Sequence, residues 1–219
     1  MKAVDALVTE DLPTAACAPH EMAFAALDDA EASAFAAVAW CSAHLVAAHR
    51  VLYAEAAKRL PEGPRRVRAQ RAVDHRLEQA VCRLDRKLTG DTHLCATSIT
   101  ELAGEVRAIL SEHAVGEAEL VADVMNVLDD EEQERLATRL AKAMRCAPTR
   151  PHPHTRHMPL GALVSRLDAC IDRARDLMDN RVVPTPYNAR LPRAPGRWAC
   201  YLMGTPYPTA PVDEVTDRT

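Results

Sequence analysis

Apolar side chains recur every three or four residues through residues 98–128, and this spacing constrains the fold more than any other feature. At about 100° per residue, such positions fall on one face of a helix. The stripe contains Ile99, Leu102, Val106, Leu110, His113, Glu117, Leu120 and Val124. A helix of this length must bury its apolar face, so the sequence predicts that it packs into a core.

Helical spacing of apolar residues also occurs in other parts of the chain. The further stretches are residues 19–27, 33–60, 65–88 and 131–145. Aromatic residues make up only 4% of the sequence, glycine occurs 7 times, and runs of β-branched residues, which favour strands, are almost absent. We therefore predict an all-α fold, an antiparallel four-helix bundle with an extra C-terminal helix and a Pro-rich tail.

The same patterns divide the chain into segments. We expect a flexible N-terminus over residues 1–18, the bundle over 19–146, and a Pro/His-rich linker over 147–159. Residues 160–180 have the spacing of an amphipathic helix. The many prolines of residues 181–219 predict a poorly structured tail.

Composition argues against several classes of protein. There is no stretch of about 18 uncharged apolar residues, so we expect no membrane span, and the acidic N-terminus does not resemble a signal peptide. The seven cysteines are irregularly spaced, which favours reduced thiols in a cytoplasmic protein.

Charge is unevenly distributed along the chain. Residues 65–87 hold eight Lys and Arg against three Asp and Glu, whereas residues 101–134 hold eleven Asp and Glu and one Arg. The two stretches either face each other or form separate solvated faces. No aromatic residue interrupts the basic stretch, and the net charge is −4, so we expect no nucleic-acid partner.

His113 and Glu117 lie one helical turn apart in the middle of the apolar stripe. Burial of a carboxylate is costly unless it is paired or bound to a metal. Two readings remain open from the residues alone, a metal-ligating pair and a structural hydrogen-bonded pair. His20 lies on the apolar face of residues 19–27, whereas the periodicity of residues 65–88 places His75 toward solvent.

Three segments resemble the second half of the hemerythrin-like HHE cation-binding family. They are Ser111-Glu112-His113-Ala114-Val115-Gly116-Glu117-Ala118-Glu119-Leu120, Asp130-Glu131-Glu132-Gln133-Glu134-Arg135-Leu136 and Ala147-Pro148-Thr149-Arg150-Pro151-His152-Pro153-His154. In that family a four-helix bundle holds two non-haem irons, ligated by histidines and bridging glutamates. The resemblance covers about residues 19–154 and is less specific in its first half.

The resemblance implies a set of metal ligands. His113 and Glu117 match the pair on the last helix of the family, and His20, His44 and His75 match histidines of the first, second and third helices. The resemblance therefore predicts that His75 faces the core, whereas the helical periodicity places it toward solvent.

One family ligand is missing. Ala48 stands where the family has the first-half glutamate, and His49 follows it as a substitute ligand if the helix is rotated. A di-iron site, a single-metal site and a lost site are therefore all open. Pro-rich sequence around His152 and His154 predicts an extended histidine-rich run, which offers at most a weak surface metal site.

Two functions follow as expectations. The resemblance implies a non-haem iron protein, with one or two ions, that handles O2, NO or peroxide or senses iron. The alternative is a degenerate bundle without metal that serves as a structural or interaction protein. The sequence contains no Gly-rich phosphate loop and no GxSxG or HExxH motif that defines an enzyme class.

Overall fold

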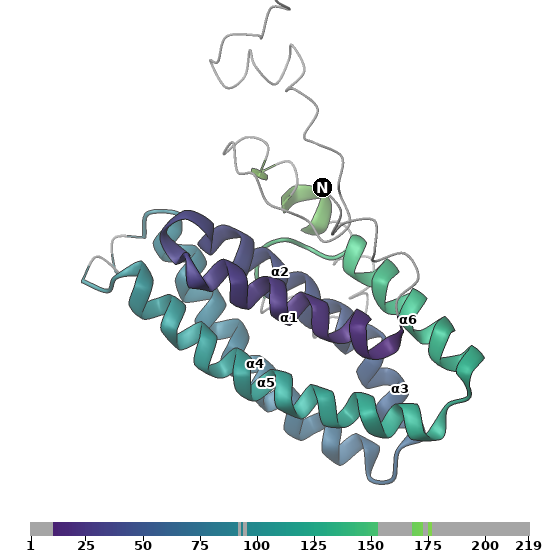
Figure 1. The fold of residues 1–219 in the computed structure, drawn as a ribbon. Helices are drawn as coiled ribbons and strands as arrows, with labels where there is room; N and C mark the ends of the chain where they lie inside the picture. The colour runs from purple at the N-terminus through teal and green to yellow at the C-terminus, as the bar shows by residue number, and fades with distance from the viewer. Residues whose placement is uncertain (1–10, 92, 94–95, 153–167, 173–174, 177–219) are drawn as a thin grey trace, which may run out of the picture.

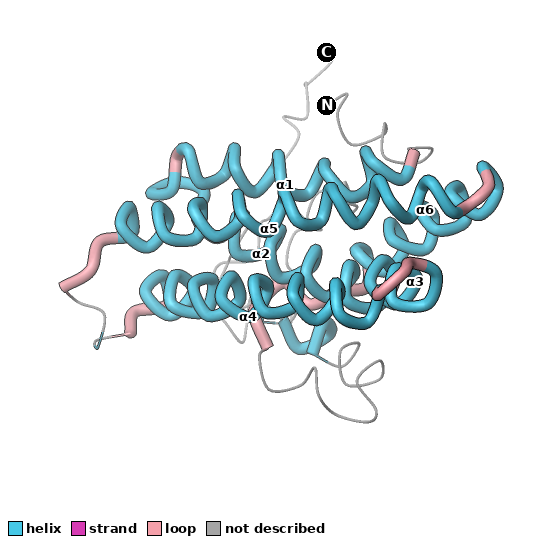
Figure 2. The backbone as a smooth tube through the Cα atoms, turned by 90° about the horizontal axis from the view of Figure 1, so that it is seen from below, coloured by secondary structure: helices cyan, strands magenta, loops and turns pink. Residues whose placement is uncertain are grey.

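The computed structural model describes residues 11–91, 93, 96–152, 168–172 and 175–176 of the 219-residue chain. The tail expected over residues 181–219, most of the C-terminal helix and His154 lie outside the described residues. Within them every regular element is helical, as Figure 2 shows. The prediction of an all-α fold is confirmed for this part of the chain.

The first helix, α1 (Leu12–Asp28), begins before the expected residue, Pro19. Asp11 caps it, because its carboxylate accepts a hydrogen bond from Thr14 N at 2.9 Å. Pro19 lies inside the helix, although proline supplies no N–H to the helical ladder. Burial of Leu12 and Ala16 on the same helix favours the longer element, so the predicted start was wrong.

The stretch predicted as one helix over residues 33–60 is divided at Val51. Helix α2 (Ala30–Arg50) ends there and α3 (Leu52–Arg59) follows at once. Val51 N still bonds to Ala47 O at 3.0 Å, so the backbone bends without leaving the helical ladder. Residues 37–48 of α2 are all buried, as its apolar residues on two sides predicted.

The remaining helices follow their predicted bounds closely. Helix α4 spans Gly63–Leu88, α5 spans Ile99–Val127 and α6 spans Asp130–Arg145. Ser98 and Glu101 form a capping box at the start of α5, and Asp129 caps α6. Gly63 permits the tight turn into α4, because an added Cβ would lie 2.4 Å from Ala56 O.

The helices α1, α2, α4 and α5 surround one core. Helix α1 packs against α2 and α5, and α4 packs against the same two helices, while α3 contacts α4 and α6 packs on α1 and α2. Figure 1 shows the long helices lying side by side, with the green α6 beside α1 and α2. The four long helices α1, α2, α4 and α5 run antiparallel in chain order, so residues near their middles meet in the middle of the core.

The basic and acidic stretches face each other across α4 and α5. Three ion pairs cross this boundary, between Arg66 and Asp123, Arg76 and Glu112, and Arg83 and Glu105. The six side chains are between 30% and 52% exposed, so solvent screens each pair and its contribution to stability is small. Of the two arrangements left open by the sequence, the facing one is found.

One helical stretch of the described chain, Ser33–Arg59, is long and apolar enough to cross a membrane. In this structure 78% of its most apolar 18-residue segment is buried inside the bundle. Burial against neighbouring helices accounts for its composition, so the stretch is weak evidence for a membrane span.

Candidate metal centre

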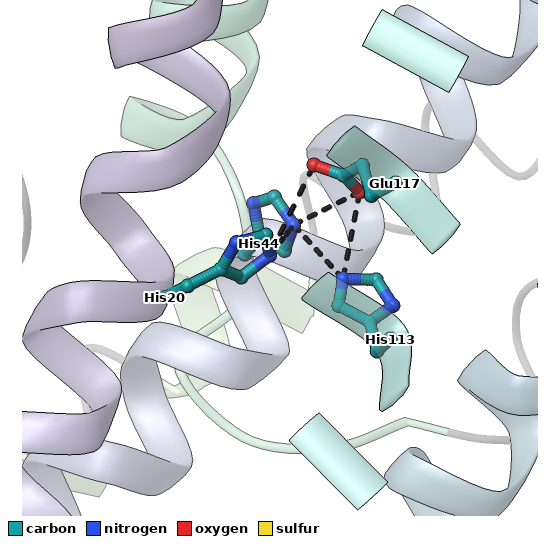
Figure 3. Close-up of side chains that lie close together, drawn as sticks. All are labelled: His20, His44, His113 and Glu117. Atoms are coloured by element: carbon teal, nitrogen blue, oxygen red, sulfur yellow. Dashed lines mark hydrogen bonds and ion pairs between the residues drawn. The ribbon is translucent and has the colours of Figure 1, made fainter. Parts of the chain in front are cut away.

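Three helices bring four polar side chains together in the core. His20 comes from α1, His44 from α2, and His113 and Glu117 from α5. They are 6%, 2%, 0% and 1% exposed, in that order. Figure 3 shows the side chains pointing toward one another, and one ligand atom of each lies within 4.8 Å of the others. The arrangement could hold a metal ion.

The ring nitrogens converge through the same atom of each histidine. His20 Nε2 lies 2.9 Å from His44 Nε2, which in turn lies 3.2 Å from His113 Nε2. Glu117 Oε2 is 3.1 Å from His44 Nε2 and 3.4 Å from His113 Nε2. The rings meet edge to face, which lets three lone pairs point at one small volume.

The positions of His20 and His44 along the chain, at different distances from the turn at Asp29, predict a difference in height of several ångströms. This difference does not separate the ring nitrogens, because the two imidazoles reach each other with centroids 4.4 Å apart. His20 and His44, which come from the half of the chain where the resemblance is less specific, therefore both belong to the cluster.

Hydrogen bonds within the cluster leave an excess of acceptors. His44 Nε2 faces His20 Nε2, His113 Nε2 and Glu117 Oε2, yet a ring nitrogen carries at most one proton. Among the described residues, the buried atom Glu117 Oε1 has no hydrogen-bond partner, and neither has His44 Nδ1 on the far side of its ring. Buried lone pairs are costly when unpaired, and a cation between the three Nε2 atoms and Glu117 removes that cost for the atoms that face it. The four residues thus fit a metal ion.

Electrostatics also favour donors that are ready to bind. Burial, reinforced by the neighbouring His44, lowers the pKa of His20 to about 3, so its ring stays neutral. Burial alone would raise the pKa of Glu117, but the three histidines outweigh it and lower that pKa to about 2. The cluster therefore offers an ionised carboxylate and a neutral imidazole at neutral pH.

A second layer of side chains orients the first. Asp74 of α4 lies with Oδ1 2.7 Å from His113 Nδ1, and Tyr53 OH donates to Glu117 Oε2 at 3.4 Å. Burial would lower the pKa of His113, but the hydrogen bond and charge of Asp74, together with the charge of Glu117, raise it. A carboxylate behind a histidine fixes the ring's tautomer and leaves Nε2 for the metal.

The structure brings together four of the six candidate ligands, His20, His44, His113 and Glu117. His49 lies outside the cluster. Its Nε2 is 2.6 Å from Asp74 Oδ2, and its ring lies 5.1 Å from that of Tyr53. His49 therefore contacts the carboxylate behind His113, and the rotation that would make it a ligand in place of Ala48 is not found.

His75 is exposed and lies outside the cluster, close to Gln79. The expectation of a core-facing His75 was wrong, and the helical periodicity was right. Asp74, one residue earlier, occupies the buried position that the resemblance gave to a histidine. The sequence contains the signal, because Asp74 continues the apolar register of Val67, Leu77, Val81 and Leu84.

Ala48, which stands where the family has a glutamate, is surrounded by other side chains of the core. Ala48 is fully buried in the core, on the helix that carries His44. Within the described parts of the chain, one group of His, Cys, Asp and Glu has the spacing of a metal site. The described residues therefore contain one cluster that could hold a metal ion.

His152 is placed away from this site. Its Nε2 lies 3.0 Å from both carboxylate oxygens of Asp172, in the segment after α6. The hydrogen bond and charge of Asp172 raise the pKa of His152. The expected weak surface site at His152 and His154 stays a prediction, because His154 lies outside the described residues.

No family model matches the chain, and searches of curated proteins and of solved structures found no match either. The case for a function therefore rests on the geometry of the four side chains and on the residues around them.

Proposed function

We propose that this chain is a hemerythrin-like non-haem iron protein in which His20, His44, His113 and Glu117 hold one iron ion. The observation that carries the proposal is the convergence of three Nε2 atoms and one carboxylate in a site with more acceptors than donors. Helical bundles build metal sites from inward-facing side chains of neighbouring helices in this way.

The donor set favours iron over ions that prefer sulfur. Imidazole suits iron, copper, nickel and zinc, and carboxylate suits the harder divalent ions, so a mixed set fits Fe²⁺. Cysteine, which would favour zinc, does not belong to the cluster among the described residues. Four protein ligands close a tetrahedral zinc site but leave coordination positions on a six-coordinate iron.

A single ion suits the anionic groups present. Glu117 is the one carboxylate in the cluster, and Asp74 adds a second negative charge behind His113. Together they balance the charge of one divalent ion. A second ion would need further carboxylates, and buried Ala48 supplies none. Support for a di-iron centre comes from the sequence resemblance alone.

Burial of the four side chains limits the size of the molecules that can reach the ion. All four side chains are almost completely buried, so a molecule that reaches the ion must be small. Iron with a free coordination position supplies reversible binding or redox chemistry for such molecules, and O2, NO and peroxide are our proposed ligands. The protein's own contribution is to orient the imidazoles, to exclude water and to place Tyr53 OH beside Glu117.

Metal analysis tests the proposal. Protein from iron-supplied cells should contain about one iron per chain, and His113→Ala should lose it. His75→Ala is the matched control, because His75 is an exposed histidine outside the cluster and its loss should leave the iron content unchanged. Iron-free wild-type protein that takes up no Fe²⁺ in vitro would favour the metal-free alternative, and two ions per chain would favour a di-iron centre.

A further inference from the structure

The amide of Gln70, a residue of α4, lies against the middle of α5, beside His113. Its Nε2 donates to the backbone oxygen of His113 at 3.0 Å and lies 3.2 Å from His113 Nδ1. The same nitrogen is 3.5 Å from Asp74 Oδ1, which His113 also contacts. Gln70 is buried, so one amide group contacts both a candidate ligand and the carboxylate that orients it.

Gly116 makes room for this amide. A Cβ added at Gly116 would lie 2.2 Å from Gln70 Oε1 and 3.2 Å from its Cδ. Gly116 is in the middle of α5, where glycine is less favourable than alanine, and it directly precedes Glu117. The amide oxygen of Gln70 therefore occupies the space that any other side chain at position 116 would take.

We propose that Gln70, seated on Gly116, is a positioning residue for the metal centre. The inference rests on the proposed metal-binding function and adds a residue that does not touch the ion. Asp74 is shared between His113, on Oδ1, and His49, on Oδ2. Gln70 contacts Oδ1 and the His113 backbone together, so it holds the carboxylate and the imidazole in one relative orientation.

A groove beside Gln70 can accommodate its amide if a side chain at position 116 displaces it. A groove of about 410 Å³ lies between α4 and α5, and Gln70 and Gly116 are part of its wall with Val73, Val115 and Leu120. The atoms that a Cβ at position 116 would meet belong to the end of a flexible side chain. Gly116→Ala should therefore push the Gln70 amide aside while the bundle stays folded.

Gly104 provides a matched control on the same helix. A Cβ added there meets nothing within 4 Å, so Gly104→Ala makes the same chemical change with no displacement. Both substitutions favour the helical state of α5, and each should leave the melting temperature of the metal-free protein unchanged or raise it. If Gly116→Ala alone binds metal more weakly, the cause is then the displaced Gln70 amide and not a loss of folding.

Co²⁺ titration tests the inference, because the absorption bands of bound Co²⁺ report both affinity and ligand geometry. We expect Gly116→Ala and Gln70→Met to bind Co²⁺ about 10-fold more weakly with shifted bands, as loss of outer ligand contacts does elsewhere. Gln70→Met keeps the side-chain length but removes the amide. Gly104→Ala should match the wild type in both affinity and spectrum.

The double variant decides whether the effect passes through Gln70. In the Gln70→Met background, Gly116→Ala should add no further shift of the bands, because the amide that it displaces is already gone. A Gly116→Ala variant with wild-type affinity and spectrum would overturn the inference, and so would an unchanged Gln70→Met. Wild-type protein that binds neither Co²⁺ nor Fe²⁺ would instead overturn the proposed function.

Discussion

His113 Nδ1 donates a hydrogen bond to Oδ1 of Asp74 over 2.7 Å, and both side chains are buried. The bond joins α5 to α4 at the level of the cluster. It also decides which ring nitrogen of His113 has a free lone pair, because a neutral imidazole with its proton on Nδ1 presents Nε2 as an acceptor. Asp74 thus determines whether the cluster presents three imidazole donors or two.

Replacing Asp74 with asparagine should weaken the metal site without removing a ligand. The amide keeps the size of the carboxylate but loses its charge, so His113 is held less firmly in the required tautomer. We expect Fe²⁺ or Co²⁺ affinity to fall about 10- to 100-fold. Calorimetric titration would measure this, and His75→Asn, at the exposed neighbour, should retain wild-type affinity.

Metal should stabilise the folded chain by mass action. At a free Fe²⁺ concentration of about 100 times Kd, the gain is about 2.7 kcal/mol, which for a chain of this size is a rise of roughly 5–10 °C in Tm. Anaerobic thermal melts with and without Fe²⁺ would measure it. His113→Ala should lose the rise and His75→Ala should keep it, whereas an equal rise in both variants would point to binding elsewhere.

Ala48→Glu tests whether the bundle retains a place for a second ion. Position 48 is fully buried, so in the metal-free protein the new carboxylate should reduce stability by about 2–4 kcal/mol. If the site holds one ion, as we propose, iron content should stay at about one per chain. An increase to two ions, measured with the stability recovered, would show that the natural site is an incomplete two-metal centre.

The parts of the structure that sequence predicts are those determined locally. The stripe of α5 repeats at helical spacing, Ser98 and Glu101 supply a capping box, and two polar residues interrupt the stripe where the site is found. Spacing and caps depend on neighbours along the chain, so α4, α5 and α6 have nearly their predicted bounds.

What sequence did not predict depends on contacts between helices. The bend at Val51 involves no proline or glycine, and Pro19 is accommodated inside α1 because the helix is packed on both sides of it. Assigning His75 to the core relied on a residue-by-residue match to the family, while the register of α4 buries Asp74 instead. The contact of His49 with Asp74 is likewise visible only once α2 and α4 are packed.

The metal-free protein should lose stability in mild acid because His20 resists protonation. Its pKa is about 3 in the folded state against an ordinary value of 6.5, so between these values the unfolded chain binds a proton that the folded chain does not. Stability therefore falls as pH decreases through this window. The raised pKa of His113 has the opposite sign, but its contribution is fully present below pH 6.5 and does not change further.

Urea unfolding at pH 6.0 and 5.0 isolates this effect, because Glu117, with a pKa lowered to about 2 from 4.5, is still largely ionised in both states. We expect His20 to account for a loss of about 1 kcal/mol over this interval. His20→Gln removes the titrating group and should flatten the dependence by that amount, while the exposed His75→Gln should follow the wild type. Equal slopes for wild type and His20→Gln would mean that His20 takes up its proton equally in the folded and unfolded chains, and that burial does not lower its pKa.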